Sequence, residues 1–247
     1  MHEVRGALAV WWREFIVFRR EVSRVVASVA SPLLWLLFFG GGLGATVRVE
    51  GTDYQSFIFP GIVVMSVLFT STFYGVYIIW DRKIDVLKAV LVAPVSRVAI
   101  FSGKVLGGCT DALIQASVLL VVGLFFVSYS PAGLLTALAV ALLTSVGFVA
   151  LGLGIGAFFE SLEGFQLIGT FVVFPLFFLS GALYPLDGVP PWLRALSRLD
   201  PVTYAVDAAR HALLGVSVHP LWLDFGVLAA FAIAAILAGS VAFSRMK

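Results

Sequence analysis

Long apolar stretches separated by short polar connections recur along the whole chain. The pattern predicts six membrane spans, at roughly residues 25–45, 57–80, 99–127, 133–158, 166–183 and 222–243. Each stretch is long enough to cross ~30 Å of hydrocarbon at a rise of ~1.5 Å per residue. The alternation of apolar and polar positions that a membrane β-barrel needs is absent. Because backbone polar groups in lipid must be satisfied internally, the chain is predicted to be an all-α polytopic membrane protein.

Residues 1–24 have a different pattern, with large apolar side chains at helical spacing and arginines on another face. The apolar positions are Leu8, Trp11, Trp12, Phe15, Phe18 and Val22. This pattern indicates an amphipathic helix that lies in the inner membrane interface, with its tryptophans at headgroup level. The alternative is a cytoplasmic extension of the first span. No cleavage site of a signal peptide follows the stretch.

Segment 184–221 is long for a connection and mixes large apolar residues with charges. Two short helices are predicted within it, Pro191–Leu199 and Pro201–Leu214, the second with Asp200 as its N-cap. We expect both to dip partly into the membrane from outside, as re-entrant helices.

Small residues recur four positions apart within the spans. The pairs are Gly40 and Gly44, Gly103 and Gly107, and Gly152 and Gly156. Such spacing lets neighbouring helices approach closely, so we expect helix contacts at these positions.

Composition supports lipid as the solvent. Of the 247 residues, 61% are hydrophobic and 12% are charged, and the mean hydropathy is +1.06. A soluble domain carries roughly 25% charged residues. The six spans leave no room for a soluble domain, so residues 1–247 are predicted to form a single transmembrane domain. The net charge of +2 is too small to indicate nucleic-acid binding, and the single cysteine, Cys109, excludes an intrachain disulfide.

Lysine and arginine are distributed unevenly between the connections. With the N-terminus inside, the inner segments carry twelve of them, Arg5, Arg13, Arg19, Arg20, Arg24, Arg82, Lys83, Lys88, Arg97, Lys104, Arg245 and Lys247. The outer segments carry four, Arg48, Arg194, Arg198 and Arg210. The positive-inside rule therefore predicts that both termini are cytoplasmic.

Residues 81–97 form a charged island between two apolar runs. Ile84, Leu87 and Leu91 recur at the spacing of a short amphipathic helix, which Pro94 ends. A patterned helix on the cytoplasmic face has the form of a docking surface. An ordinary positively charged loop is the alternative.

The chain has no recognisable catalytic set. The three histidines, His2, His211 and His219, are dispersed, and none has a cysteine or carboxylate at metal-binding spacing, so no metal site is expected. No phosphate-binding loop is present either. Asp111 lies deep in the third span at a cost of roughly 2.5–3.5 kcal/mol. Together with Gln115 it lines a substrate path, or it is a carboxylate paired within the protein.

Two separated motifs resemble membrane subunits of ABC exporters of the type-2 permease family. DRKIDVLKAVLVAPVSRVAIFSGKVLGG resembles that family's first cytoplasmic loop, with a charged opening, a short leucine-containing helix, Pro-x-Ser/Thr-Arg and Gly-Lys. The stretch after the fifth span resembles the closing signature, here Pro201, Thr203, Tyr204 and Asp207. SPLLWLLFFGGGLG resembles the first span of the drug- and lipid-exporting branch. The resemblance covers essentially the whole chain.

The resemblance implies that the island is a coupling helix seated in a separate ATPase subunit. The coupling residues would be Asp81, Arg82, Lys83, Ile84, Leu87, Lys88, Leu91, Pro94 and Arg97. It further implies two ATPase copies that bind ATP and Mg²⁺, and a second permease copy as homodimer or a paralogue, in the cell (inner or plasma) membrane. The chain itself would bind no cofactor and would not be an enzyme.

The expected function is therefore export of an amphiphilic cargo, a drug-like molecule or a lipid. A lipid-linked glycan is the alternative cargo. An ion-gradient-driven secondary transporter is another class, because the lengths of the connections resemble those of an inverted repeat. A membrane scaffold or intramembrane enzyme is the third. Neither of these other classes explains the paired motifs.

Overall fold

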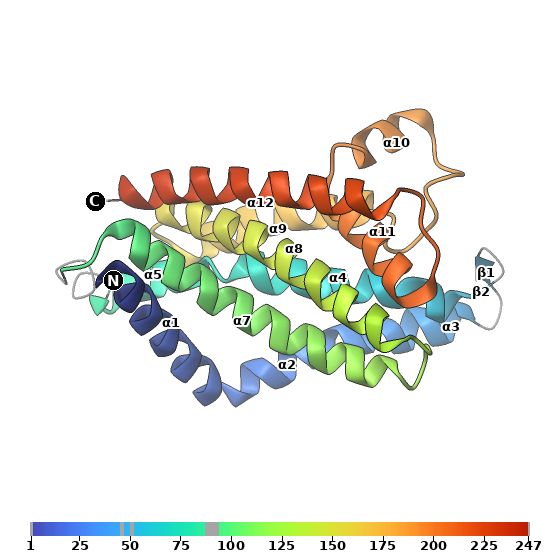
Figure 1. The fold of residues 1–247 in the computed structure, drawn as a ribbon, viewed down its shortest axis with the longest axis horizontal. Helices are drawn as coiled ribbons and strands as arrows, with labels where there is room; N and C mark the ends of the chain where they lie inside the picture. The colour runs from blue at the N-terminus through green and yellow to red at the C-terminus, as the bar shows by residue number, and fades with distance from the viewer. Residues whose placement is uncertain (1, 45–46, 50–51, 87–93, 247) are drawn as a thin grey trace.

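The computed structural model of the chain describes residues 2–44, 47–49, 52–86 and 94–246. Most of these residues are helical, and the long helices lie side by side along the longest axis of the molecule (Figure 1). Within the described ranges, six helical segments are long and apolar enough to cross a membrane: Val26–Gly44, Tyr54–Lys83, Arg97–Gly123, Pro131–Phe158, Leu162–Leu179 and Leu221–Ser244. The predicted fold class, an all-α polytopic membrane protein, is confirmed.

The first two spans are each built from more than one helix. The elements in chain order are α1 (His2–Arg20), α2 (Val22–Trp35), the π-helical turn η1 (Leu36–Gly40), α3 (Gly41–Gly44), β1 (Arg48–Val49), β2 (Thr52–Asp53), α4 (Tyr54–Phe73), α5 (Val76–Lys83), α7 (Arg97–Gly123), α8 (Pro131–Phe158), α9 (Leu162–Leu179), α10 (Pro191–Ser197), α11 (Pro201–Leu214) and α12 (Leu221–Ser244). Strands β1 and β2 pair antiparallel in a short hairpin that the sequence pattern did not predict.

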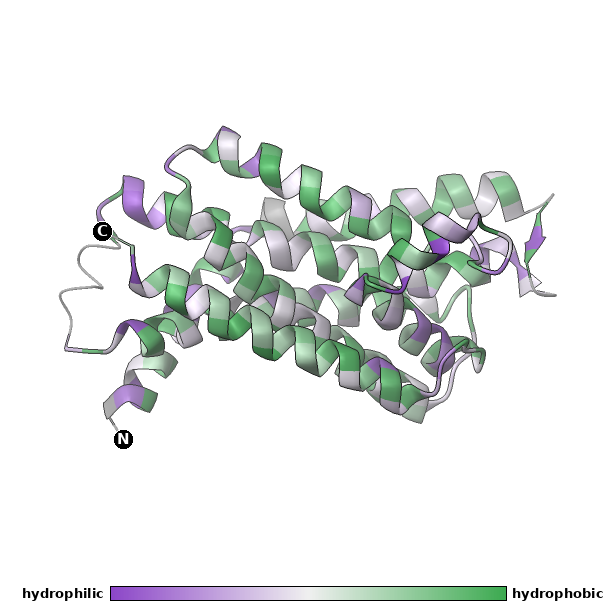
Figure 2. Ribbon diagram, turned by 90° about the horizontal axis from the view of Figure 1, so that it is seen from above, coloured by the Kyte–Doolittle hydropathy of each residue, from purple (hydrophilic) through white to green (hydrophobic). Residues whose placement is uncertain are grey.

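The centre of the bundle is formed by α4, α7 and α8. Helix α8 packs against α4, α7, α11 and α12, and α4 is buried along most of its length. Apolar residues dominate the long helices, and hydrophilic residues gather toward the two ends of the bundle (Figure 2). Both termini lie at one of these ends, and the hairpin, α10 and α11 lie toward the other (Figure 1).

Glycine permits the closest helix contacts in this core. A Cβ atom on Gly152 of α8 would lie 2.1 Å from the backbone oxygen of Thr72, and one on Gly156 would lie 2.5 Å from that of Gly75. These distances show that α8 touches the α4–α5 junction backbone to backbone. Gly103 faces the backbone oxygen of Ala7 on α1, and Gly107 faces the side chains of Tyr74 and Glu14. A Cβ atom on Gly40 would lie 2.7 Å from the Gln55 side chain of α4, whereas one on Gly44 would lie 3.9 Å from it. Close contacts therefore occur at all of the predicted positions except Gly44.

Helix α1 is a separate helix that packs along α7. Glu21, with φ −93° and ψ 58°, interrupts the helical path between α1 and α2, and the two helices meet at an angle (Figure 1). Trp11 Nε1 donates a hydrogen bond of 2.9 Å to Thr110 Oγ1 on α7, while Leu8 and Trp12 are about half exposed. Part of the predicted apolar face of α1 therefore packs against α7, and part of it is exposed. Placement of α1 in the membrane interface stays a prediction.

Helix α11 folds back into the bundle between α4, α8 and α12. Its N-cap is Asp200, as expected, whose side chain accepts a hydrogen bond of 2.9 Å from Val202 N. The apolar face of α11 that includes Val202 and Val206 is fully buried. Helix α10 ends at Ser197, two residues before the predicted end, and is peripheral, with Trp192 64% exposed.

Replacing Gly152 with alanine should destabilise the bundle. The added methyl group would collide with backbone atoms of Thr72, which cannot move aside like the end of a flexible side chain. We expect a loss of about 1–3 kcal/mol, the range for overpacked cores. The measurement is the thermal unfolding midpoint of the purified protein in detergent.

Gly226→Ala on α12 is the matched control. Gly226 is exposed and has no atom within 4 Å of its hypothetical Cβ. Alanine favours a helix over glycine by roughly 0.5–1 kcal/mol, so this variant should be at least as stable as the original chain. Equal midpoints for the two variants would contradict the close contact at Gly152.

Candidate functional site

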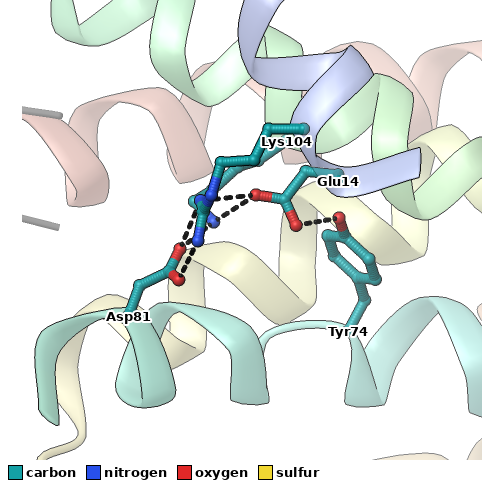
Figure 3. Close-up of polar contacts among 5 residues, drawn as sticks. Glu14, Tyr74, Asp81 and Lys104 are labelled. Carbon is teal, nitrogen blue, oxygen red and sulfur yellow. Dashed lines mark hydrogen bonds and ion pairs between the residues drawn. The ribbon is translucent and has the colours of Figure 1, made fainter. Parts of the chain in front are cut away.

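A cluster of buried charges joins three helices at the end of the bundle where the termini lie. Lys104 of α7 donates from Nζ to Glu14 Oε1 of α1 at 3.0 Å and to Asp81 Oδ2 of α5 at 2.5 Å (Figure 3). The Lys104 side chain is 1% exposed, and those of Glu14 and Asp81 are buried too. Charges buried in this way are stable only when they are paired and hydrogen-bonded.

Two further side chains complete this cluster, which we call the ion cluster: Arg13, Glu14, Tyr74, Asp81 and Lys104. Arg13 forms a bidentate pair with Asp81, with distances of 2.6 Å and 3.2 Å, and this interaction raises the pKa of Arg13. Tyr74 donates its hydroxyl to Glu14 Oε2 at 3.0 Å. The two cations balance the two carboxylates. The ion cluster therefore ties α1, α5 and α7 together without leaving a net buried charge.

The position of Asp81 corrects one prediction from the sequence. We expected Asp81 on the surface of the charged island, as a contact for another subunit. The structure places it inside the bundle, because Lys104 and Arg13 both bind its carboxylate. Lys104, which the sequence assigned to the inner polar segments, is buried for the same reason.

Two other predicted coupling residues cap helix ends within the chain. Arg82 donates to the backbone oxygens of Ala157 and Phe159 at the end of α8. Arg97 donates to those of Ser244 and Met246 at the end of α12, each at 2.7 Å. The carbonyls at a helix C-terminus lack intrahelical partners and carry partial negative charge, which explains why arginine binds there.

The remaining coupling residues lie at or between the ends of α5 and α7. Lys83, Ile84 and Pro94 are exposed, and Ile84 is 58% exposed. The predictions for Leu87, Lys88 and Leu91 concern residues outside the part of the chain that the structure describes. The coupling helix therefore stays a prediction from the sequence, flanked by α5 and α7, whose ends lie on the same side as the termini (Figure 1).

A cavity of about 720 Å³ adjoins the ion cluster. Its polar wall includes Glu14, Asp81, Asp111 and Gln115, so the structure brings both predicted path residues to one surface. Its remaining lining is largely apolar or aromatic and comprises Val17, Phe18, Phe73, Val76, Tyr77, Trp80 and Ile84, with Arg13, Glu21, Ser28, Thr70 and Gln166 as further polar groups. A cavity lined by both charged and aromatic side chains suits an amphiphilic molecule.

Gln115 separates this cavity from a second one of about 240 Å³. Its amide donates to the backbone oxygen of Ser28 on α2 and accepts from the hydroxyl of Thr70 on α4. Gln115, Ser28 and Thr70 line both cavities. Gln115 therefore joins α7 to α2 and α4 at the place where the two cavities share residues.

The second cavity shares residues with a third hollow, a groove lined by α2 and η1 alone. Trp35 and Ser31 line both the second cavity and a third of about 380 Å³ that reaches Phe38 and Phe39. The rings of Trp35 and Phe39 stack with centroids 4.7 Å apart. The three hollows share lining residues in turn, from the ion cluster along α2.

The predicted motif in segment 184–221 surrounds a smaller cavity of about 170 Å³ near the opposite end. Thr203 and Asp207 line it. Pro201 is the first residue of α11, and Tyr204 donates its hydroxyl to the backbone oxygen of Arg198 at 2.8 Å. Burial raises the pKa of the preceding Asp200 carboxyl to about 7.

Sequence reasoning missed Glu14 and the surroundings of Asp207. Glu14 lies on the face of α1 that carries Trp11 and Phe18, and a carboxylate among apolar positions is a signal for a buried partner. Asp207 accepts backbone hydrogen bonds from Val218 and His219, and His219 Nδ1 lies 3.1 Å from its Oδ2. Asp224, in the first turn of α12, lies beside them, and this convergence was not visible from spacing in the sequence.

Comparison with known families decides the identity of the bundle. The pattern of the family described as "ABC-2 type transporter" matches residues 6–214, most of the chain. The chain belongs to the ABC-2 type transporter family. The ABC-2 match includes the charged island and the Pro201–Asp207 motif, on which the resemblance was based.

Individual relatives support the same ABC-2 assignment over nearly the full length. The inner membrane transport permease YadH of Escherichia coli K12 is 33% identical over 234 residues, which cover 92% of this chain and 90% of the relative. Nodulation protein J of Rhizobium meliloti is 30% identical over 230 residues, covering 92% and 88%. Nodulation protein J of Rhizobium leguminosarum bv. viciae is 27% identical over 242 residues, covering 96% and 93%.

Two statements follow from the ABC-2 membership. The chain is a multi-pass membrane component of an ABC transporter, as the six apolar helices require. It works with an ABC ATPase subunit, as ABC-2 permeases do.

Replacing Lys104 with methionine should strongly destabilise this ABC-2 permease. The change leaves Glu14 and Asp81 buried with Arg13 as their remaining cation. Breaking a buried ion pair from one side costs about 3–5 kcal/mol. Lys83→Met, at an exposed position of α5, is the control, and thermal unfolding in detergent is the measurement.

The same experiment distinguishes charge balance from packing. Adding Glu14→Gln to Lys104→Met removes one carboxylate and restores a one-to-one balance of charge. If the ion cluster acts through charge pairing, the double variant is more stable than Lys104→Met alone. If the double variant is less stable than the single one, this account of the ion cluster is wrong.

Proposed function

We propose that this chain is the transmembrane subunit of an ATP-driven exporter for an amphiphilic cargo, either a drug-like molecule or a lipid. The whole chain, residues 1–247, acts as one permease domain with both termini in the cytoplasm. The observation that carries the proposal is the series of three cavities, which begins beside charged residues and continues between aromatic ones. Membership of an ABC family favours ATP over an ion gradient as the source of energy.

The first cavity fits the two parts of such a cargo. A polar headgroup would face Asp111, Gln115 and the Arg13 side chain, which is 33% exposed. The apolar part would lie against Phe73 and Trp80. The cost of burying a carboxylate such as Asp111 in a span is repaid when polar cargo groups or neighbouring residues pair with it.

Gln115 is the gate in this mechanism. Its two hydrogen bonds join α7 to α2 and α4 and close the passage between the first and second cavities. Cargo passes when these bonds break and α2 separates from α7. Beyond the gate, Trp35 and the aromatic residues of the second and third cavities guide the apolar part along α2.

The ion cluster transmits the movement that opens the gate. The coupling helix predicted around Leu87 and Leu91 connects α5 to α7, and the ion cluster ties both of these helices to α1. A displacement of the coupling helix by the ATPase therefore moves three walls of the first cavity together. ATP and Mg²⁺ bind on the partner, and the partner must hold the coupling helix differently in its two nucleotide states for ATP to drive the change.

The functional assembly contains two ATPase copies and a second permease, as a homodimer or with a paralogue. The face of α2, η1 and α9 supports this arrangement, since it exposes large apolar side chains such as Phe38 and Phe171. The second permease would close the open side of the cavity series. Lipid covers the remaining apolar surface.

A lipid-linked glycan is the second candidate cargo. Aromatic rings bind sugars as well as acyl chains, and the stacked pair Trp35 and Phe39 lies on the third cavity. Proteoliposomes that contain the permease with its co-purified ATPase can distinguish these cargoes. A fluorescent phospholipid and a lipid-linked oligosaccharide are offered separately, and ATP-dependent movement is measured; movement of neither, in an assembly that hydrolyses ATP, would contradict the proposal.

Gln115→Ala should uncouple transport from ATP hydrolysis in these vesicles. Loss of both hydrogen bonds opens the constriction, so cargo leaks without ATP and the amount moved per ATP falls several-fold. Gln166→Ala is the matched control, because Gln166 lines the first cavity and not the second. Unchanged leak and coupling in Gln115→Ala would exclude the gate.

Leu87→Asp combined with Leu91→Asp should abolish stimulation of the ATPase by the permease. Two charges on the apolar stripe of the predicted helix would have to be buried in the ATPase cleft, at a high desolvation cost. Asp85→Asn is the control on the same segment, since asparagine tolerates the φ of 57° found there. Undiminished stimulation and transport in the double variant would remove the coupling role.

A further inference from the structure

Three potential metal ligands converge at the end of the bundle remote from the ion cluster. Asp207 comes from α11, His219 from the α11–α12 connection and Asp224 from the first turn of α12. His219 Nδ1 lies 3.1 Å from Asp207 Oδ2 and 3.9 Å from Asp224 Oδ1. One ligand atom from each residue lies within 4.8 Å of the other two.

The surroundings of Asp224 indicate independently that a ligand binds at this site. Its side chain is 0% exposed, and neither carboxylate oxygen has a hydrogen bond to any residue that the structure describes. Buried carboxylates are normally hydrogen-bonded, paired or bound to a metal, because the cost of removing them from water is otherwise uncompensated. Arg210, on the same helix as Asp207, donates to Gly181 O and stacks over the Phe57 ring.

We propose that Asp207, His219 and Asp224 bind a divalent transition-metal ion of the Zn²⁺ class. One imidazole nitrogen and two carboxylate oxygens form a donor set that Zn²⁺ accepts, whereas Ca²⁺ requires six to eight oxygen ligands. In a tetrahedral site with bonds of ~2.1 Å, ligand atoms lie about 3.4 Å apart. The observed spacings of 3.1 Å and 3.9 Å bracket this value.

The surroundings hold two of the ligands in place before any ion arrives. The backbone N–H groups of Val218 and His219 donate to the Asp207 carboxylate at 2.8 Å and 2.7 Å, which fixes the connection against α11. Hydrogen bonds to ligating carboxylates orient them and are a regular feature of metal sites. Asp207 Oδ1 accepts only the bond from Val218 N and so retains a lone pair for the ion, whereas Oδ2 accepts from both backbone N–H groups.

The ion has a route of entry and a free coordination position. Asp207 and His219 line the cavity of about 170 Å³ at this end, and the His219 side chain is 28% exposed. Three protein ligands leave the fourth position of Zn²⁺ for water. Once bound, the ion joins α11 to α12, and α11 in turn packs against α4 and α8.

The test is a titration of the purified full-length chain in detergent, after treatment with a chelator and its removal. Isothermal calorimetry with ZnCl₂ should show one ion bound per chain, with CaCl₂ and MgCl₂ binding at least about tenfold more weakly. Zn²⁺ should also raise the thermal unfolding midpoint, since an ion that binds the folded state stabilises it.

His219→Gln and Asp224→Asn should each weaken Zn²⁺ binding at least about tenfold. Losing a residue that only hydrogen-bonds to a metal ligand already lowers metal affinity roughly 10–100-fold, and these two residues are ligands. His211→Gln is the matched control on α11: His211 Nδ1 lies 3.1 Å from Ser217 Oγ and outside the cluster. His219 is partly exposed, so His219→Gln keeps the test valid if Asp224→Asn does not fold. No binding by the original chain, equal binding by His219→Gln, or a preference for Ca²⁺ would each overturn the proposal.

Discussion

The pairing of buried charges in the ion cluster is the constraint on which the rest of this structure depends. An apolar bundle cannot hold an isolated carboxylate or ammonium group, so Glu14, Asp81 and Lys104 must remain together once buried. Their pairing fixes α1 against α7 and joins α5 to both. The segment between α5 and α7 is therefore anchored on both flanks, and a force applied there reaches the wall of the cavity beside the ion cluster.

The two sides of the bundle differ in packing, and the difference follows from small residues. Gly152 and Gly156 bring α8 against the α4–α5 junction, so on this side the helix backbones are in direct contact and leave no space for larger side chains. On the other side, α2 is largely exposed, and the cavities lie along it, bridged at one level by Gln115. A tightly packed half beside a loosely packed one provides both a rigid support and a surface that can separate.

Elements set by local pattern were predictable from the sequence, whereas sites set by tertiary packing were not. Hydrophobic runs gave the spans, and a proline after an acidic cap gave the start of α11. Asp81 was assigned to the surface because its sequence neighbours are charged; its partners Arg13 and Lys104 lie 68 and 23 residues away. Asp111 and Gln115 were singled out by the cost of polar groups in lipid, and the structure places both on the cavity wall. His219 looked isolated because only the return of α11 brings it to Asp207 and Asp224.

The two polar clusters at opposite ends differ in their charge balance, and this difference has consequences for transport. In the ion cluster, two cations meet two carboxylates, so its closed arrangement is complete without any external ion. Asp207, His219 and Asp224 combine two carboxylates with one imidazole, and the second carboxylate lacks a hydrogen-bond partner among the described residues. The second cluster therefore contains a buried carboxylate whose desolvation no hydrogen bond to a described residue offsets. In this ABC transporter subunit, an ion bound at Asp207, His219 and Asp224, as proposed above, would stabilise the end remote from the termini and leave the ion cluster unaffected.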